Sequence, residues 1–98
     1  MGDVSKVWYW VREWSEAASF PDVHIFGTES EARQTMIAEA KDAAAILGGW
    51  LTVDLDGDSV SHILQPGNVV HDTLTNINVQ REGGAVDCFS LESQEVTL

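Results

Sequence analysis

Basic residues are scarce in this sequence, and cysteine and proline are scarcer still. The chain has 98 residues, with five Lys and Arg against 16 Asp and Glu, so its formal net charge is -11 at pH 7. A surface of this sign repels nucleic-acid phosphates and anionic membranes, and it attracts basic proteins, most commonly those that bind nucleic acid. Charge alone favours the simpler interpretation, which is solubility.

The single cysteine, Cys88, excludes an internal disulfide and a thiolate metal cluster. It lies in an apolar run, and we expect a buried structural thiol. No apolar run approaches the length that spans a membrane. The N-terminus also lacks the basic start and long apolar core of a signal peptide. These absences predict a cytoplasmic protein with no membrane contact.

The N-terminal part of the chain predicts two strands. Residues 4–14 are rich in Val, Trp and Tyr, which favour strands, and residues 23–26 form a second short run. Both faces of the first strand carry bulky side chains, as in a strand covered by a helix on one side and partly covered on the other. Alternation assigns Val7, Tyr9 and Val11 to one face and Trp8, Trp10 and Arg12 to the other.

The strongest local signal predicts a helix that ends at Leu47. Thr28 and Glu31 fit a capping box, and Gly48-Gly49 supplies a C-cap. Between these ends there is no Gly or Pro. A narrow stripe of mostly small residues recurs at helical spacing and would pack on a sheet. Its members are Ala32, Met36, Ala40, Ala43 and Leu47, widened by Ile37 and Ala44.

Strands and turns are expected after the helix. In a first hairpin turning at Asp56-Gly57, Val53 would lie opposite Val60 and Leu51 opposite His62. Residues 65–68 are expected to form a second turn.

A final hairpin from about residue 73 to residue 93 would turn at Glu82-Gly83. This register sets Val79 opposite Val86 and Ile77 opposite Cys88. The tail would add a little more strand or fray.

The predicted architecture is one α+β domain over residues 1–98. It has an antiparallel sheet of about five to six strands with one long helix packed on one face, in the order ββαββββ. Ninety-eight residues suffice for a single modest core and not for two.

Asp54, Asp56 and Asp58 raise the question of a calcium loop. An EF-hand loop has Gly at its sixth position and Glu at its twelfth, whereas here Gly57 is fourth and Gln65 is twelfth. A hairpin turn explains Asp56-Gly57 directly, so the segment is interpreted as a turn.

No motif predicts catalysis, a cofactor or a metal site. The histidines, His24, His62 and His71, share no zinc spacing, although His62 and His71 with Asp72 could form a site assembled across strands. There is no glycine-rich phosphate loop and no nucleophile motif. The protein is therefore expected not to be an enzyme.

Four tryptophans in 98 residues are dense. They either fill a small core, as Trp commonly does, or leave Trp8, Trp10 or Trp14 as an exposed aromatic anchor for a protein partner. Stacking on nucleic-acid bases is disfavoured because few cations lie nearby.

The acidic residues occur in groups. Glu31, Glu39 and Asp42 lie roughly along one side of the predicted helix. Glu29 and Glu31 also lie near the helix N-terminus, where the helix dipole is positive. This position explains the presence of these two residues without a partner. The candidate partner-binding residues are Trp8, Trp10, Glu13, Glu31, Glu39, Asp42, Asp54, Asp56 and Asp58.

The segments "VWYWV" and "VHIFGTESEARQTMIAEA" resemble small acidic phage and mobile-element proteins of the anti-CRISPR type. The shared pattern is an aromatic strand, a second strand and an acidic-capped helix, over about the first 45 residues. Several such proteins mimic nucleic acid or occlude binding surfaces. The resemblance implies a similar inhibitory role and transfers no functional residue.

The leading hypothesis is a non-enzymatic binding protein that inhibits or regulates a basic nucleic-acid-handling complex, as a DNA mimic does. Its carboxylates would occupy phosphate sites, and an aromatic residue would anchor it. The alternatives are a small homo-oligomeric assembly protein, paired through a strand edge or the tryptophan face, and a metal- or ligand-binding domain.

Overall fold

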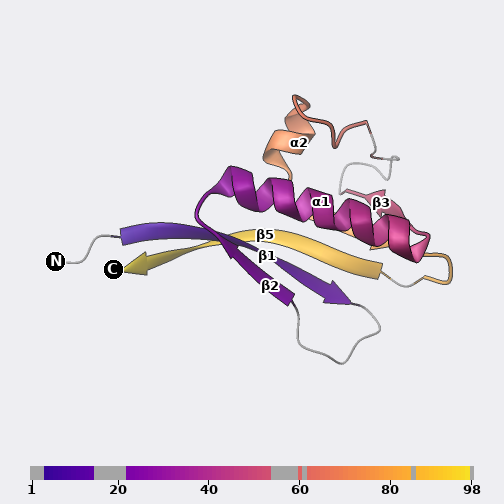
Figure 1. Ribbon diagram of the computed structural model, residues 1–98, viewed down its shortest axis with the longest axis horizontal. Helices are drawn as coiled ribbons and strands as arrows, with labels where there is room; N and C mark the ends of the chain where they lie inside the picture. The colour runs from indigo at the N-terminus through magenta and orange to yellow at the C-terminus, as the bar shows by residue number, and fades with distance from the viewer. Residues whose placement is uncertain (1–3, 15–21, 54–59, 61, 85, 98) are drawn as a thin grey trace.

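The computed structural model describes residues 4–14, 22–53, 60, 62–84 and 86–97. Five strands form one sheet in the order β2-β1-β5-β4-β3, and every neighbouring pair is antiparallel. The long helix α1 crosses one face of this sheet (Figure 1). The elements are β1 (Val4–Trp14), β2 (Asp22–Phe26), α1 (Glu29–Leu47), β3 (Trp50–Thr52), α2 (Val69–Thr73), β4 (Asn76–Gln80) and β5 (Val86–Thr97).

The predicted class, α+β with an antiparallel sheet and a helix on one face, is confirmed. The predicted order ββαββββ is wrong, because the short helix α2 lies between β3 and β4. Asn68 caps this helix, since its side chain accepts a hydrogen bond from the backbone N–H of Val70 at 2.9 Å. Asn side chains favour such N-cap positions.

The strand β1 lies between β2 and the central strand β5. It pairs with β5 along its whole length and with β2 only from Trp8 to Arg12. The predicted alternation is correct: Trp10 is buried beneath α1, and its ring lies 5.7 Å from that of Phe89. The indole N–H of Trp10 donates to the Thr35 hydroxyl at 3.1 Å, so burial of this polar group is compensated.

The helix α1 begins and ends as the sequence predicts. Thr28 accepts a hydrogen bond from the Glu31 N–H at 3.2 Å, and Gly48 takes the left-handed conformation with φ 65°. The stripe of Ala32, Met36 and Ala40 is buried against the sheet, together with neighbouring residues. Leu47, assigned to this stripe from the sequence, is instead 36% exposed, because it lies at the last turn of the helix.

The register of β4 and β5 differs by one residue from the prediction. Val79 pairs with Asp87 and Ile77 with Phe89. A shift of one residue moves each side chain to the other face of the strand. In the observed register Phe89 and Leu91 enter the core in place of Val86 and Cys88, which buries more apolar surface.

The predicted pairing of Leu51 with His62 is also wrong. Leu51 pairs with Val79, and His62 lies in a turn. The sequence pattern did not reveal β4 as the partner of β3. Both β4 and the segment around Val60 offer apolar residues at the spacing that β3 requires. The turn proposed at Asp56-Gly57 lies outside the described residues. The turn over residues 65–68 is confirmed, since the Asn68 N–H donates to the Gln65 carbonyl at 3.1 Å.

A buried carboxylate joins several elements of the fold. Asp87 on β5 is fully buried and accepts hydrogen bonds from Arg12 on β1 at 2.9 Å and from Arg81 at 3.0 Å. The Arg12 guanidinium also lies over the Phe89 ring, at 5.2 Å, and 3.7 Å from Glu39 on α1. This cluster therefore links β1, β5, α1 and the residue that follows β4.

We expect Asp87→Asn to lower the free energy of unfolding by about 3 kcal/mol, because it leaves two guanidinium groups against a neutral amide. Chemical denaturation measures this value. Glu82→Gln removes an exposed carboxylate from the same hairpin and should change stability by less than about 0.5 kcal/mol. Equal effects of the two substitutions would show that the Asp87 cluster contributes nothing.

Gly49, between α1 and β3, is expected to tolerate no side chain. A Cβ atom there would collide with the Gln80 carbonyl oxygen and lie 3.2 Å from Cγ of Arg81. We expect Gly49→Ala to cost more than about 2 kcal/mol in the same denaturation measurement, since backbone atoms must move. Gly27→Ala is the matched control, because no atom lies within 4 Å of the added methyl group. A cost at position 49 no larger than at position 27 would contradict this account.

Candidate interaction surface

The five basic side chains all have contacts within the chain. Arg12 and Arg81 bind Asp87, and Arg33 donates to the Leu74 carbonyl at 2.9 Å and to Glu29. The ammonium group of Lys41 donates to the Leu64 carbonyl at 3.3 Å, and that of Lys6 lies over the Trp8 ring. The three arginines are at least partly buried, and the chain has 16 Asp and Glu against five Lys and Arg, so exposed carboxylates dominate the surface charge.

The outer side of α1 carries the clearest group of carboxylates. Three of the predicted partner-binding residues are exposed there: Glu31, Glu39 and Asp42. An α-helix turns about 100° per residue, so these three residues fall within an arc of about 80°. Ile46 falls in the same arc and is 81% exposed. We call these four residues the acidic helix face.

The structure does not bring all the predicted binding residues together. Trp10 is 3% exposed, so the expectation of an exposed anchor is wrong for this residue. Trp8 is partly buried and packs against the core on the same side of the sheet. Glu13 is exposed but alternates with Arg12, so it projects from the opposite side of the sheet. Asp54, Asp56, Asp58 and the Trp14 side chain lie outside the described part of the chain.

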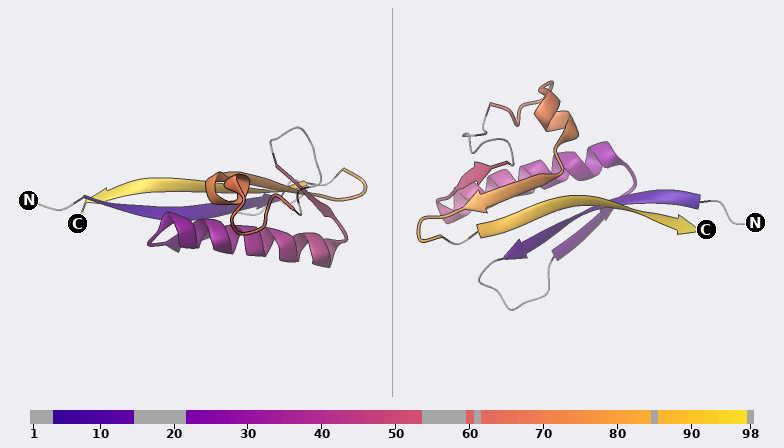
Figure 2. Two further views of the ribbon diagram at one scale, coloured as in Figure 1. Left: turned by 90° about the horizontal axis from the view of Figure 1, so that it is seen from above. Right: turned by 180° about the vertical axis from the view of Figure 1, so that it is seen from behind.

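The side of the sheet away from α1 forms a second surface, which we call the open face. Figure 2 shows α1 on one side of the sheet, and in the described ranges no helix covers the other. The strand registers place uncharged residues over most of this face. They are Val7, Tyr9 and Val11 on β1, Ile25 on β2, Trp50 and Thr52 on β3, Asn76, Asn78 and Gln80 on β4, and Val86, Cys88 and Ser90 on β5.

Polar side chains on the open face bond to each other along the sheet. The Asn76 amide donates to the Ser90 hydroxyl at 3.2 Å, and Gln80 donates to Thr52 at 3.2 Å. Cys88 is partly exposed on this face, which corrects the expectation of a buried thiol. The alternation of Val7, Tyr9 and Val11 in the sequence predicts that they share one face of β1, but it does not indicate a function for that face.

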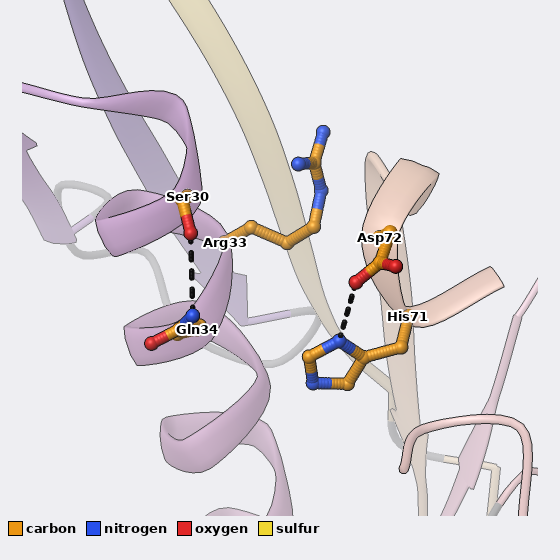
Figure 3. A pocket seen from close by; sticks show the side chains of 5 residues that line it. All are labelled: Ser30, Arg33, Gln34, His71 and Asp72. Atoms are coloured by element: carbon orange, nitrogen blue, oxygen red, sulfur yellow. Dashed lines mark hydrogen bonds and ion pairs between the residues drawn. The ribbon is translucent and has the colours of Figure 1, made fainter. Parts of the chain in front are cut away.

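A shallow polar pocket lies between the start of α1 and α2 (Figure 3). Its volume is about 220 Å³, and it is lined by Ser30, Arg33, Gln34, His71 and Asp72. Arg33 extends from α1 toward α2, where the His71 ring lies 3.3 Å from the Asp72 carboxylate. All five lining residues are polar, and their side chains already bond within the chain: Gln34 to Ser30, His71 to Asp72, and Arg33 to Glu29 and the Leu74 carbonyl.

Metal binding has no support in the described part of the chain, where no group of three or more His, Cys, Asp or Glu side chains is placed to hold an ion. His62 lies in a turn and His71 on α2, and they form no such group with Asp72. None of the helices among the described residues is long and apolar enough to cross a membrane.

Comparisons with protein-family models, curated proteins and solved structures gave no significant match to this chain. The function is therefore inferred from the two surfaces themselves.

Titration of Tyr9 tests the placement of Tyr9 and Glu92 on the open face. Partial burial, together with a hydrogen bond and charge repulsion from Glu92, raises the pKa of Tyr9 above 10.0. The chain has one tyrosine, so phenolate absorbance reports Tyr9 alone. We expect Glu92→Gln to lower the titration midpoint, because a neutral amide no longer opposes the phenolate.

Glu95→Gln is the control for this titration, because Glu95 projects from the other face of β5. It should leave the midpoint unchanged. A midpoint that does not respond to Glu92→Gln would contradict the placement of these two side chains.

Proposed function

We propose that the protein is a non-enzymatic acidic binding protein that inhibits or regulates a basic, nucleic-acid-handling protein complex. The observation that carries the proposal is the acidic helix face, where three exposed carboxylates precede Ile46 and only Glu39 has a cation nearby, Arg12 at 3.7 Å. Such a surface attracts a basic groove over long range and excludes nucleic acid from it. The proposal includes a cytoplasmic location and no direct contact with nucleic acid or membrane.

The proposed anchor differs from the tryptophans that the sequence suggested. Ile46 protrudes about one turn beyond Asp42, at the C-terminal end of the acidic helix face, and would enter an apolar pocket of the partner, since a few side chains contribute most of the binding energy in many interfaces. Trp10 is buried in the core and is not available for this role.

The spacing of the carboxylates limits the kind of mimicry. Along α1, Glu31 and Asp42 are separated by about 16 Å, because a helix rises 1.5 Å per residue. One DNA strand carries a phosphate every ~3.4 Å over the same distance. The acidic helix face would therefore compete for a basic groove by its overall field and its apolar anchor, and it would not copy each phosphate.

The proposal is tested by capture from a host lysate. The tagged chain is incubated at low salt, and bound proteins are eluted by a salt gradient or displaced by double-stranded DNA. We expect one nucleic-acid-binding complex, with affinity falling at least about tenfold between about 50 mM and about 300 mM salt. Affinity that does not change with salt, or a partner that DNA does not displace, would refute the mimic.

A charge-matched pair of variants tests the surface. We expect Glu31→Gln/Asp42→Asn to weaken binding to the captured complex about fivefold, at ~0.5 kcal/mol per lost ion pair. The control Glu82→Gln/Glu95→Gln removes the same net charge from exposed positions that are not on α1 and should weaken binding less than about twofold. Equal weakening by both variants would assign the attraction to net charge and not to α1.

A further inference from the structure

We propose that the open face is the interface of a homodimer, in which two copies of this chain pack sheet against sheet with both α1 helices outward. The proposal is independent of the partner-binding role. The interface would include Tyr9 and Val11 on β1 and Cys88 on β5, with Glu13 and Glu92 beside them.

The distribution of charge decides which faces two copies of the chain can bring together. Each chain carries -11, so two copies repel each other over most of their surfaces. On the open face the described charged side chains are two carboxylates: Glu13, which lies opposite Cys88, and Glu92, which bonds to Tyr9 within the same chain. The helix side carries the acidic helix face. Two copies can therefore approach most closely through their open faces.

Geometry keeps the remaining charges apart in this arrangement. Packed sheets lie ~10 Å apart, and a helix lies about as far again from its own sheet. The two acidic helix faces would then be at least about 30 Å apart. This is more than three times the Debye length of ~8 Å at physiological salt, so their mutual repulsion is screened.

The open face is also large enough. Strand spacing of ~4.8 Å and a rise of ~3.4 Å per residue give the five strands a flat area of about 600 Å², and side chains enlarge the accessible surface. Stable interfaces bury about 600 to 1,000 Å² on each partner. The face has exposed apolar residues near opposite edges of the sheet, Ile25 on β2 at 70% and Trp50 on β3 at 51%.

Sedimentation velocity on the purified chain tests the dimer. From about 1 to about 100 µM, the mass should rise from that of one 10.7 kDa chain toward twice that value. Added salt should leave the dissociation constant unchanged or lower it, because apolar contact drives association and Glu13 and Glu92 oppose it. A monomer at every concentration overturns the proposal, even if another protein binds this face.

Two substitutions of the same chemistry distinguish the faces. Ile25→Glu places a charge on the open face and should raise the dimer dissociation constant at least about tenfold. Ile46→Glu makes the same change at a residue of similar exposure on α1 and should leave it unchanged. Loss of the dimer in Ile46→Glu, or its persistence in Ile25→Glu, would exclude the open face. Since Ile46 belongs to the proposed partner surface, failure of that role would appear in capture and not in sedimentation.

Cys88 supplies a second readout without substitution. It is the chain's one cysteine and is partly exposed on the open face. Its rate of maleimide labelling should fall as the protein concentration passes the dissociation constant, because dimerisation covers the thiol. A labelling rate independent of concentration in a sample that sediments as a dimer would place the interface elsewhere.

Discussion

The ion pairs between buried Asp87 and the arginines at positions 12 and 81 are the interaction on which the fold depends most. A buried carboxylate is costly unless charged hydrogen bonds compensate it. Two of the chain's few cations are used for this purpose, and a third holds α2 to α1 through Arg33. The acidity of the surface is in part a consequence, since the cations that would offset it are engaged inside.

The structure has two sides of different character. Carboxylates gather on the outer side of α1, whereas Glu13 and Glu92 are the only charged side chains on the open face among the described residues. This division follows from a sheet with a helix on one face, because β1 alternates between the core and the opposite side. The two sides suit different contacts: attraction to a basic partner on one, and apolar packing on the other.

The sequence was sufficient where the signals were local. The bounds of β1 and the ends of α1 follow from residue preferences, a capping threonine and a glycine in the left-handed conformation. Pairing between distant strands was harder, since Val86 and Phe89 both offer apolar side chains and a shift of one residue exchanges the faces. The ion pair between Asp87 and Arg12, which favours the observed register, joins residues 75 positions apart in the sequence. Likewise, the sequence could not show which tryptophans α1 covers.

The pairing of β1 with the central strand β5 has a consequence for how the chain acquires its structure. Val4 pairs with Thr97 and Trp14 with Asp87, so the longest ladder of the sheet joins elements at opposite ends of the described chain. During synthesis β1 emerges early and β5 last among these elements. The core face of β1, with Trp8 and Trp10, lacks its main neighbour until translation of the described elements is nearly complete. High contact order of this kind slows folding and leaves that apolar strand open to chaperones in the interval.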